Sequence, residues 1–235
     1  MTPSRAVDLA EALFLRDEPA WIAVENAHAV NLATSDPPHL AVLRSADLVL
    51  NDGKGVMLGA RLLGRDFPAD LNGNFFTPLL LERAALRGWR TFLLGAEPGV
   101  VEHAAEVLIE RHPGLVVSGT RHGYIRPDEN EKVCETIRVS GAELLLVGMG
   151  MPRQERWTYE NLTATGCRLA STVGAFFDFQ TGHVQRAPAW LNRIGLEWVH
   201  RLAMEPRRLW RRYLLGNPLF IGRVLRQRLA SGSHR

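Results

Sequence analysis

Short apolar runs alternate with stretches of helical periodicity along most of this chain, and the alternation constrains its fold more than any other feature. Each apolar run is bounded by turn residues and has the length of a buried strand. Strands are expected at Trp21–Val24, Leu48–Leu50, Thr91–Leu94, Leu115–Ser118, Leu144–Val147 and Leu169–Val173. Helices are expected between them at Lys54–Leu63, Phe75–Arg87, Pro98–Arg111, Asp128–Val139 and Pro152–Thr165. This order predicts an α/β fold: a Rossmann-like, mostly parallel sheet flanked by helices, with right-handed crossovers.

Glycines and polar residues follow several of the predicted strands. In open parallel sheets, ligands bind beyond the carboxyl ends of the strands. Asp52 follows the second predicted strand and precedes Gly53, so its carboxylate is expected to project into a cleft on a closely approachable backbone. Gly148 and Gly150 end the fifth strand, and Pro152 suits the first turn of a helix whose free amides attract anions. The pattern therefore predicts a site for a phosphorylated small molecule.

From Pro188 the pattern becomes all-helical, which divides the chain into a Rossmann-like α/β domain of residues 1–187 and a helical appendage of residues 188–235. Helices are expected at Pro188–Ala203, Pro206–Leu215 and Pro218–Leu229, with a break at Gly216-Asn217-Pro218. Residues 1–185 hold 17 Lys/Arg against 23 Asp/Glu, whereas residues 186–235 hold 11 arginines against two glutamates. So uneven a distribution indicates that the basic appendage meets an anionic partner.

The arginines of the appendage interleave with large apolar residues, and this pattern has two compatible interpretations. A basic helix with a wide apolar face can lie in the interface of an anionic membrane. The same apolar face can instead pack on the sheet domain and leave the arginines in solvent. A nucleic-acid partner is not expected, because the sheet domain is acidic and the chain contains no known RNA- or DNA-binding motif.

Composition also bounds the compartment and the chemistry. The sequence contains no apolar run of about 18 residues and no secretion signal at its N-terminus, and its two cysteines suit a reducing cytoplasm. The eight histidines show no close ligand spacing, and no Asp-x-Asp pair of the kind that binds a divalent cation is present. We therefore expect neither a metal nor a cofactor, and expect arginines to supply positive charge instead.

An ordered series of motifs from about residue 20 to 213 resembles the WecG/TagA/CpsF glycosyltransferases. The matching stretches are Asn26-Ala27-His28, Ala46–Gly53 with Gly55, Leu93-Leu94-Gly95, Gly148–Glu155, Val173-Gly174, Phe177-Asp178-Phe179, Arg186-Ala187-Pro188, Gly195–Trp198, Arg201-Leu202 and Glu205-Pro206. The resemblance implies an inverting transferase that moves a hexose from a UDP-sugar to a polyprenyl-diphosphate-linked acceptor in surface polysaccharide or exopolysaccharide biosynthesis. The hexose implied is of the N-acetylmannosamine, mannosaminuronate, glucose or glucuronate type. The resemblance further implies a cytoplasmic protein on the inner face of the bacterial plasma membrane, and leaves homo-oligomerisation open.

The resemblance also implies roles for individual residues. Asp52 is expected to be the base that takes the acceptor's hydroxyl proton, which contributes on the order of 10²–10⁴ in rate. The residues expected to bind substrate are Asn26, Gly53, Gly95, Gly148, Gly150, Gln154, Gly174, Asp178, Arg186, Arg201, Arg208 and Arg211. Asp178 could equally hold Arg186 in a structural pair, and the three arginines of the appendage are expected to reach the diphosphate.

Three positions depart from the family pattern. Val24 replaces a threonine, Asp70 replaces an arginine, and Phe75 replaces an aspartate. These changes keep open a catalytically impaired protein that binds a nucleotide-sugar or acts as a membrane scaffold. A dinucleotide oxidoreductase is disfavoured, because no Gly-x-Gly-x-x-Gly follows a predicted strand.

Overall fold

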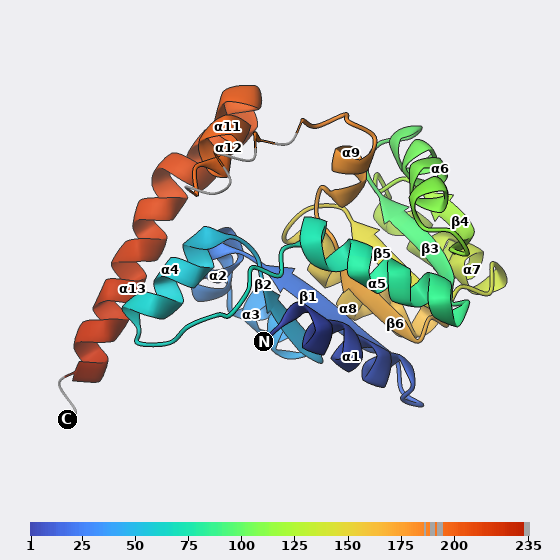
Figure 1. Cartoon of the computed structure of the whole chain (residues 1–235), viewed down its shortest axis with the longest axis horizontal. Helices are drawn as coiled ribbons and strands as arrows, with labels where there is room; N and C mark the ends of the chain where they lie inside the picture. The colour runs from blue at the N-terminus through green and yellow to red at the C-terminus, as the bar shows by residue number, and fades with distance from the viewer. Residues whose placement is uncertain (186, 189–190, 192–194, 233–235) are drawn as a thin grey trace.

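The computed structural model describes residues 1–185, 187–188, 191 and 195–232. Its centre is a six-stranded, wholly parallel sheet in the order β2-β1-β6-β5-β3-β4 (Figure 1). The strands are β1 (Ala20–Glu25), β2 (Leu48–Asn51), β3 (Arg90–Gly95), β4 (Val116–Arg121), β5 (Leu144–Gly148) and β6 (Leu169–Thr172). The α/β prediction and all six predicted strands are thus confirmed, with β4 running three residues further than expected.

Helices cover both faces of the sheet, because the strands are apolar on both sides. One face packs on α1 (Pro3–Phe14), α5 (Gly73–Arg87), α6 (Val100–Arg111) and α9 (Phe176–Gln180). The other packs on α3 (Pro37–Arg44), α7 (Asn130–Val139) and α8 (Arg153–Thr165), with the short 3₁₀ turn η1 (Pro127–Glu129) before α7. Strand β5 is buried along its whole length, as expected of a central strand in a parallel sheet.

Four helices of the sheet domain were not expected from the periodicity: α1, α2 (Ala27–Ser35), α3 and α9. Helices α2 and α3 are short and meet at Asp36, which ends α2 and whose side chain caps α3 by accepting from the His39 backbone N–H at 3.2 Å. The cap and the proline that follows it are the local signals that mark this junction. The five predicted helices are all present, including α4 (Lys54–Leu62).

The described part of the appendage forms α11 (Glu197–Met204), α12 (Pro206–Trp210), a π-helical turn η2 (Arg211–Leu215) and α13 (Gly216–Gly232). The predicted break at residues 216–218 is wrong, because η2 continues directly into α13. Pro218 falls in the first turn of α13, where a missing backbone N–H breaks no helical hydrogen bond. Part of the helix expected from Pro188 lies outside the described residues.

Helix α13 packs along α2 and α4 at the β2 edge of the molecule (Figure 1). Phe220 and Val224 are buried there against Gly59 of α4. The Asn31 amide donates to the Gly216 carbonyl at 2.7 Å, and Arg223 donates to the Asn31 carbonyl and side-chain oxygens at 2.9 Å each. Part of the apolar face of the appendage therefore packs on the sheet domain, as one of the two interpretations requires.

Other apolar residues of α13, among them Leu219, Leu225 and Leu229, are exposed. Contact of these residues with a membrane stays a prediction, because the packing of Phe220 and Val224 on the sheet domain leaves them exposed. In the described part of the chain, no helix combines the length and apolarity needed to cross a bilayer. The division of the chain at residues 187 and 188 likewise stays a prediction.

Replacing Asn31 should loosen α13. Asn31→Ala removes the amide that binds Gly216 and one acceptor of Arg223, which should lower the free energy of unfolding by about 1–3 kcal/mol. Limited proteolysis should cut within α13 faster than in the unaltered protein. Thr34→Ala is the control, because that exposed hydroxyl bonds only the Val30 carbonyl of its own helix. Equal proteolysis of both variants would contradict the role of Asn31.

Candidate active site

Asp52 lies at the carboxyl end of β2, beside the end of β1. Its backbone N–H donates to the Glu25 carbonyl at 2.8 Å, which extends the pairing of the two strands. The Asn26 amide donates to Asp52 Oδ2 at 3.1 Å, while Asn26 Oδ1 caps α2 by accepting from the His28 N–H at 3.0 Å. Asn26 therefore fixes the orientation of the Asp52 carboxylate, which is only partly buried.

The loop after Asp52 is held by Asp70, one of the three positions that depart from the family pattern. Asp70 Oδ1 accepts from the backbone N–H groups of Gly53 at 2.9 Å and Asn72 at 3.2 Å. Gly53 has φ +87°, and no atom lies within 4 Å of the point where a Cβ would sit. A glycine is required there by the backbone conformation, and it leaves open space beside the carboxylate. Asn72 serves as the N-cap of α5.

The protein raises the pKa of Asp52 to about 6. Burial is the main cause, and the nearby carboxylates of Asp70 and Glu197 act in the same direction. The hydrogen bond from Asn26 and the positive charge of Arg212 oppose the rise. A carboxylate whose pKa lies near neutrality is suited to act as a general base, because it is ionised at pH 7 and still takes up a proton readily.

Two buried glutamates behind Asp52 were missed as functional candidates. Glu25 is 6% exposed and neither carboxylate oxygen has a hydrogen-bond partner among the described residues. Glu155, at the start of α8, is fully buried and accepts from the Gln154 amide at 2.6 Å. Burial raises the pKa of both carboxyls, and the charges of Glu155 and Asp52 raise that of Glu25 further. A glutamate at the end of an apolar strand, next to Asn26, was the sequence signal.

Arg212 brings positive charge from the appendage to this acidic group. It is partly buried in η2, and its charge lowers the pKa of Asp52, Glu25 and Glu155. Burial lowers the pKa of Arg212 itself, and its Nε has no hydrogen-bond partner among the described atoms. The guanidinium lies 5.7 Å from the Tyr213 ring centroid. A partly buried guanidinium with an unused donor, whose charge acts on carboxylates at strand ends, can bind an anionic oxygen of a ligand.

His28 is a weaker base than Asp52. Burial, followed by the charges of Arg212 and His39, lowers the pKa of His28 to about 4. It is therefore neutral throughout the physiological range.

A sequence model of the Glycosyl transferase WecG/TagA/CpsF family matches residues 1–234. The chain belongs to this family. The curated relatives it matches include three proteins named N-acetylglucosaminyldiphosphoundecaprenol N-acetyl-beta-D-mannosaminyltransferase. One, from Bacillus spizizenii, is 32% identical over 90% of this chain and 81% of its own length. The Bacillus subtilis protein is 28% identical over 88% of this chain and 80% of its own length. The Staphylococcus aureus protein is 30% identical over 87% of this chain and 79% of its own length.

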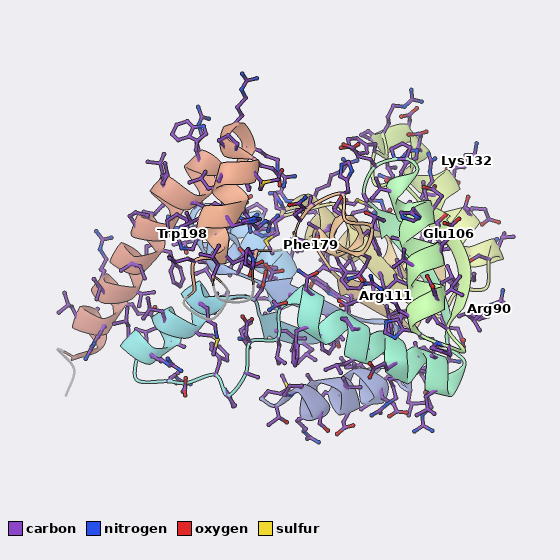
Figure 2. The ribbon with its side chains drawn as sticks, turned by 45° about the horizontal axis from the view of Figure 1, so that its top comes forward. Arg90, Glu106, Arg111, Lys132, Phe179 and Trp198 are labelled. Carbon is purple, nitrogen blue, oxygen red and sulfur yellow. The ribbon has the colours of Figure 1, made fainter. Side chains whose placement is uncertain are left out.

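The three arginines expected of a WecG/TagA/CpsF protein occupy different environments. Arg201 lies 5.4 Å from the ring centroid of Phe179, which is found between the sheet and the appendage in Figure 2. Arg208 Nε binds Glu205 at 2.6 Å. Arg211 is exposed, with its guanidinium 5.2 Å from the Trp210 ring centroid. The neighbouring Arg212, which was not a candidate, is the arginine whose charge acts on Asp52.

Gln154 joins two of the family's glycine loops. It is fully buried, and its Oε1 accepts from the backbone N–H groups of Gly150 at 3.2 Å and Gly174 at 3.1 Å. The amide of Gln154 is thus used inside the protein, where it positions the two loops and Glu155. Gly95 and Gly148 serve close packing, because a Cβ on Gly95 would come within 2.2 Å of the Gly148 carbonyl oxygen.

Asp178 lies on α9 near the appendage. Burial raises the pKa of its carboxyl, while His183 and Arg208 lower it. Arg186, the other expected binding residue of this segment and the expected partner of Asp178, lies outside the described residues. Asn26, Gly53, Gly95, Gly148, Gly150, Gln154, Gly174, Asp178, Arg186, Arg201, Arg208 and Arg211 all stay predictions as substrate ligands.

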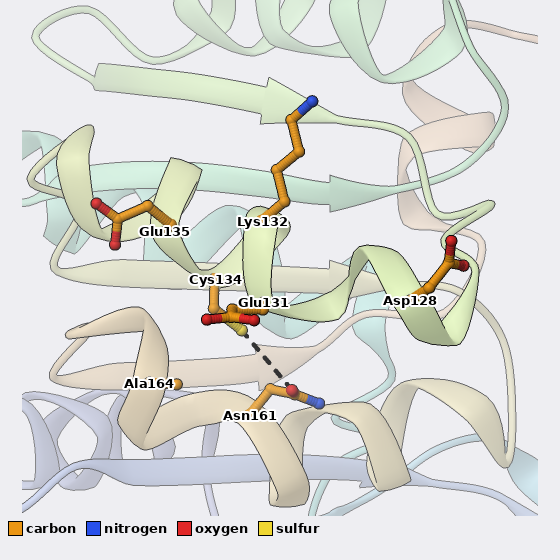
Figure 3. A pocket seen from close by; sticks show the side chains of 7 residues that line it. All are labelled: Asp128, Glu131, Lys132, Cys134, Glu135, Asn161 and Ala164. Atoms are coloured by element: carbon orange, nitrogen blue, oxygen red, sulfur yellow. Dashed lines mark hydrogen bonds between the residues drawn. The ribbon is translucent and has the colours of Figure 1, made fainter.

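A separate hollow lies between α7 and α8 (Figure 3), and α7 lies on the β4 side of the molecule, away from β2 (Figure 1). Asp128, Glu131, Glu135 and Lys132 line it, together with Cys134, Asn161 and Ala164. Burial raises the pKa of the Cys134 thiol, which donates to Asn161 at 3.7 Å and is therefore unreactive as a nucleophile. Among the described residues, no group of three His, Cys, Asp or Glu side chains could hold a metal ion.

The buried carboxyl of Glu25 should make stability depend on pH. Because its folded pKa lies above the ordinary value of 4.5, its contribution is present at low pH and is lost as pH rises through the raised pKa. Glu25→Gln should therefore gain stability over the unaltered protein at pH 8, by roughly 2 kcal/mol more than at pH 5. The Tm of both proteins at the two pH values reports the difference. The exposed Glu18→Gln is the control. A Tm difference between Glu25→Gln and the unaltered protein that is the same at both pH values would contradict the account.

Proposed function

We propose that the protein is an inverting glycosyltransferase that moves a hexose from a UDP-sugar to a sugar carried on a polyprenyl diphosphate. The observation that carries the proposal is Asp52, a carboxylate at a strand end that is oriented by Asn26 and has a pKa of about 6, which the charge of Arg212 helps to lower. Membership of the WecG/TagA/CpsF family supports the reaction class. The names of the three relatives describe a lipid-diphosphate-linked acceptor and N-acetylmannosamine as the transferred sugar.

In the proposed reaction, the acceptor hydroxyl attacks the anomeric carbon from the face opposite the diphosphate. Asp52 takes the hydroxyl proton, the new glycosidic C–O bond forms, and the anomeric C–O bond to the diphosphate breaks with inversion. UDP leaves with the bonding electron pair, so negative charge grows on its terminal phosphate oxygen. Arg212, with Arg201 and Arg208 nearby, would stabilise that charge, in place of the divalent cation that many sugar-nucleotide enzymes use.

We further propose that the reaction takes place at the inner face of the plasma membrane in the assembly of a surface polysaccharide. The exposed apolar residues and arginines of α13 support contact with an anionic lipid surface. The donor sugar is one of the four types implied by the family, with N-acetylmannosamine favoured by the names of the relatives.

Asp52→Asn should lower kcat by about 10²–10⁴-fold while leaving UDP binding intact, because the amide cannot take a proton. In the unaltered protein, kcat/KM should fall as pH drops through about 6, where Asp52 becomes protonated. Transfer assays with a panel of UDP-sugars, in which the radiolabelled product is quantified, measure both kcat and the pH dependence of kcat/KM. Near-normal turnover by Asp52→Asn would remove it from the mechanism. UDP-sugar binding without any turnover by the unaltered protein would favour the scaffold alternative.

The two adjacent arginines of η2 provide a matched pair. Arg212→Ala should lower kcat by about 10²–10³-fold, whereas the exposed Arg211→Ala should have a much smaller effect. Transfer should also continue in EDTA, because arginine supplies the charge. The arginine account would be wrong if the chelator abolished transfer and magnesium restored it, or if the two variants were equally impaired.

A further inference from the structure

A hollow of about 460 Å³ opens beside the candidate active site, between α2 and α4 of the sheet domain and α11 and α13 of the appendage. Met57, Leu58, Trp198, Phe220 and Ile221 supply most of its apolar walls. Trp198 is labelled in Figure 2 at the inner side of the appendage. The volume lies in the range of small-molecule sites, which are lined mainly by apolar side chains with a few polar groups.

The hollow adjoins the residues that follow the proposed catalytic residues in the sequence. Ala27 follows Asn26, and Lys54 and Gly55 follow the Asp52-Gly53 turn, and all three line the hollow. A ligand in the hollow would therefore have one end next to the turn that carries Asp52.

One cation at this end of the hollow is not engaged. Lys54 is exposed and forms no salt bridge with a described carboxylate. Its stem lies 3.6 Å from the position that a Cβ on Gly195 would take. Arg61, the other lining cation, is already paired with Asp66 at 3.1 Å. The hollow thus presents an apolar cavity with a free ammonium group close to Asp52, which complements an apolar chain ending in phosphate.

We propose that this hollow binds the first isoprene units of the acceptor's lipid, while Lys54 binds the diphosphate that joins the lipid to its sugar. The sugar would then reach Asp52, its reacting hydroxyl beside the base. This inference rests on the proposed function, which requires a polyprenyl-diphosphate-linked acceptor. The exposed Leu219 and Leu58, each 50% exposed, extend the apolar surface outward for the rest of the lipid chain.

The hollow depends on docking of the appendage. A Cβ on Gly59 would come within 2.7 Å of the Phe220 ring, so α13 approaches α4 as closely as a glycine permits. Arg212 lies in η2, which continues without a break into α13. The same helical segment therefore forms one wall of the lipid site and carries the arginine of the active site, so filling of the hollow by lipid would hold Arg212 at the cleft.

The test compares two acceptors that share one sugar diphosphate, the first carrying a ten-carbon isoprenyl chain and the second a methyl group. The unaltered protein should show a KM at least tenfold lower for the isoprenyl acceptor. Ile221→Trp, which fills the hollow, should abolish that difference while leaving KM for the methyl acceptor and for UDP-sugar unchanged. Leu229→Trp is the control, because Leu229 is an exposed residue of the same helix outside the hollow.

Lysine offers a second matched pair, since the chain contains only Lys54 and Lys132. Lys54→Ala should raise KM for both acceptors about tenfold, and Lys132→Ala, on the remote α7, should change neither. If Ile221→Trp also impairs transfer to the methyl acceptor, Leu58→Trp fills the hollow from the α4 side without altering the appendage. Equal KM values for the two acceptors in the unaltered protein, or equal effects of Ile221→Trp and Leu229→Trp, would overturn the proposal.

A binding measurement separates this inference from the proposed function. Geranyl diphosphate should change the fluorescence of the unaltered protein, and the change should be lost in Trp198→Phe; inorganic diphosphate should have no such effect. If no UDP-sugar is transferred to either acceptor but geranyl diphosphate binds in this way, the proposed function fails and the lipid site stands. If transfer occurs but geranyl diphosphate binds no better than inorganic diphosphate, the lipid site fails and the proposed function stands.

Discussion

The site depends on an electrostatic balance. Three carboxyls, at the ends of β1 and β2 and at the start of α8, lie on one side of it, and one arginine from the appendage lies on the other. Glu25, Asp52 and Glu155 are drawn together by the parallel sheet, and removal from water raises the pKa of each. Arg212 lowers all three. The balance leaves Asp52 with a pKa of about 6, in the range where a carboxylate can both accept and release a proton at neutral pH.

Because the arginine comes from the appendage, packing of α13 and chemistry at the strand ends are connected. Asn31 and Phe220 fix α13 against α2 and α4. Arg212 lies in the π-helical turn η2, which continues directly into α13. The appendage, whose arginines were expected to reach the diphosphate, is thereby linked to the candidate site through Arg212, and its exposed leucines are available for a lipid surface.

The sheet could be predicted from the sequence because each strand is a short apolar run between turn residues, and Asp52 because it follows such a run beside a glycine. The register of the appendage could not. Arg211 and Arg212 differ by about 100° around a helix, and only the packing of the appendage leaves Arg211 exposed and Arg212 partly buried. Glu25 was missed because its burial and the charge of Glu155 that raises its pKa are not visible in the local sequence.

The helix break that was expected at Gly216-Asn217-Pro218 is a second case in which the local sequence was not sufficient. Glycine and proline end most helices, yet Pro218 falls in the first turn of α13, and the preceding residues are held by tertiary contacts with Asn31. Gln154, whose contact with substrate stays a prediction, shows a role that the sequence did not indicate: its side-chain oxygen joins the loops of Gly150 and Gly174. Local pattern predicted where the elements lie, whereas long-range contacts determine which side chains remain free for a ligand.

Chemical rescue of Arg212→Gly is the measurement that tests the central claim most directly. If a guanidinium group facing Asp52 stabilises the leaving diphosphate, added methylguanidinium should restore transfer in a saturable manner. Tetramethylammonium at the same ionic strength should not, because it cannot donate hydrogen bonds. Wild-type transfer by Arg212→Gly, or equal restoration by both cations, would contradict the account.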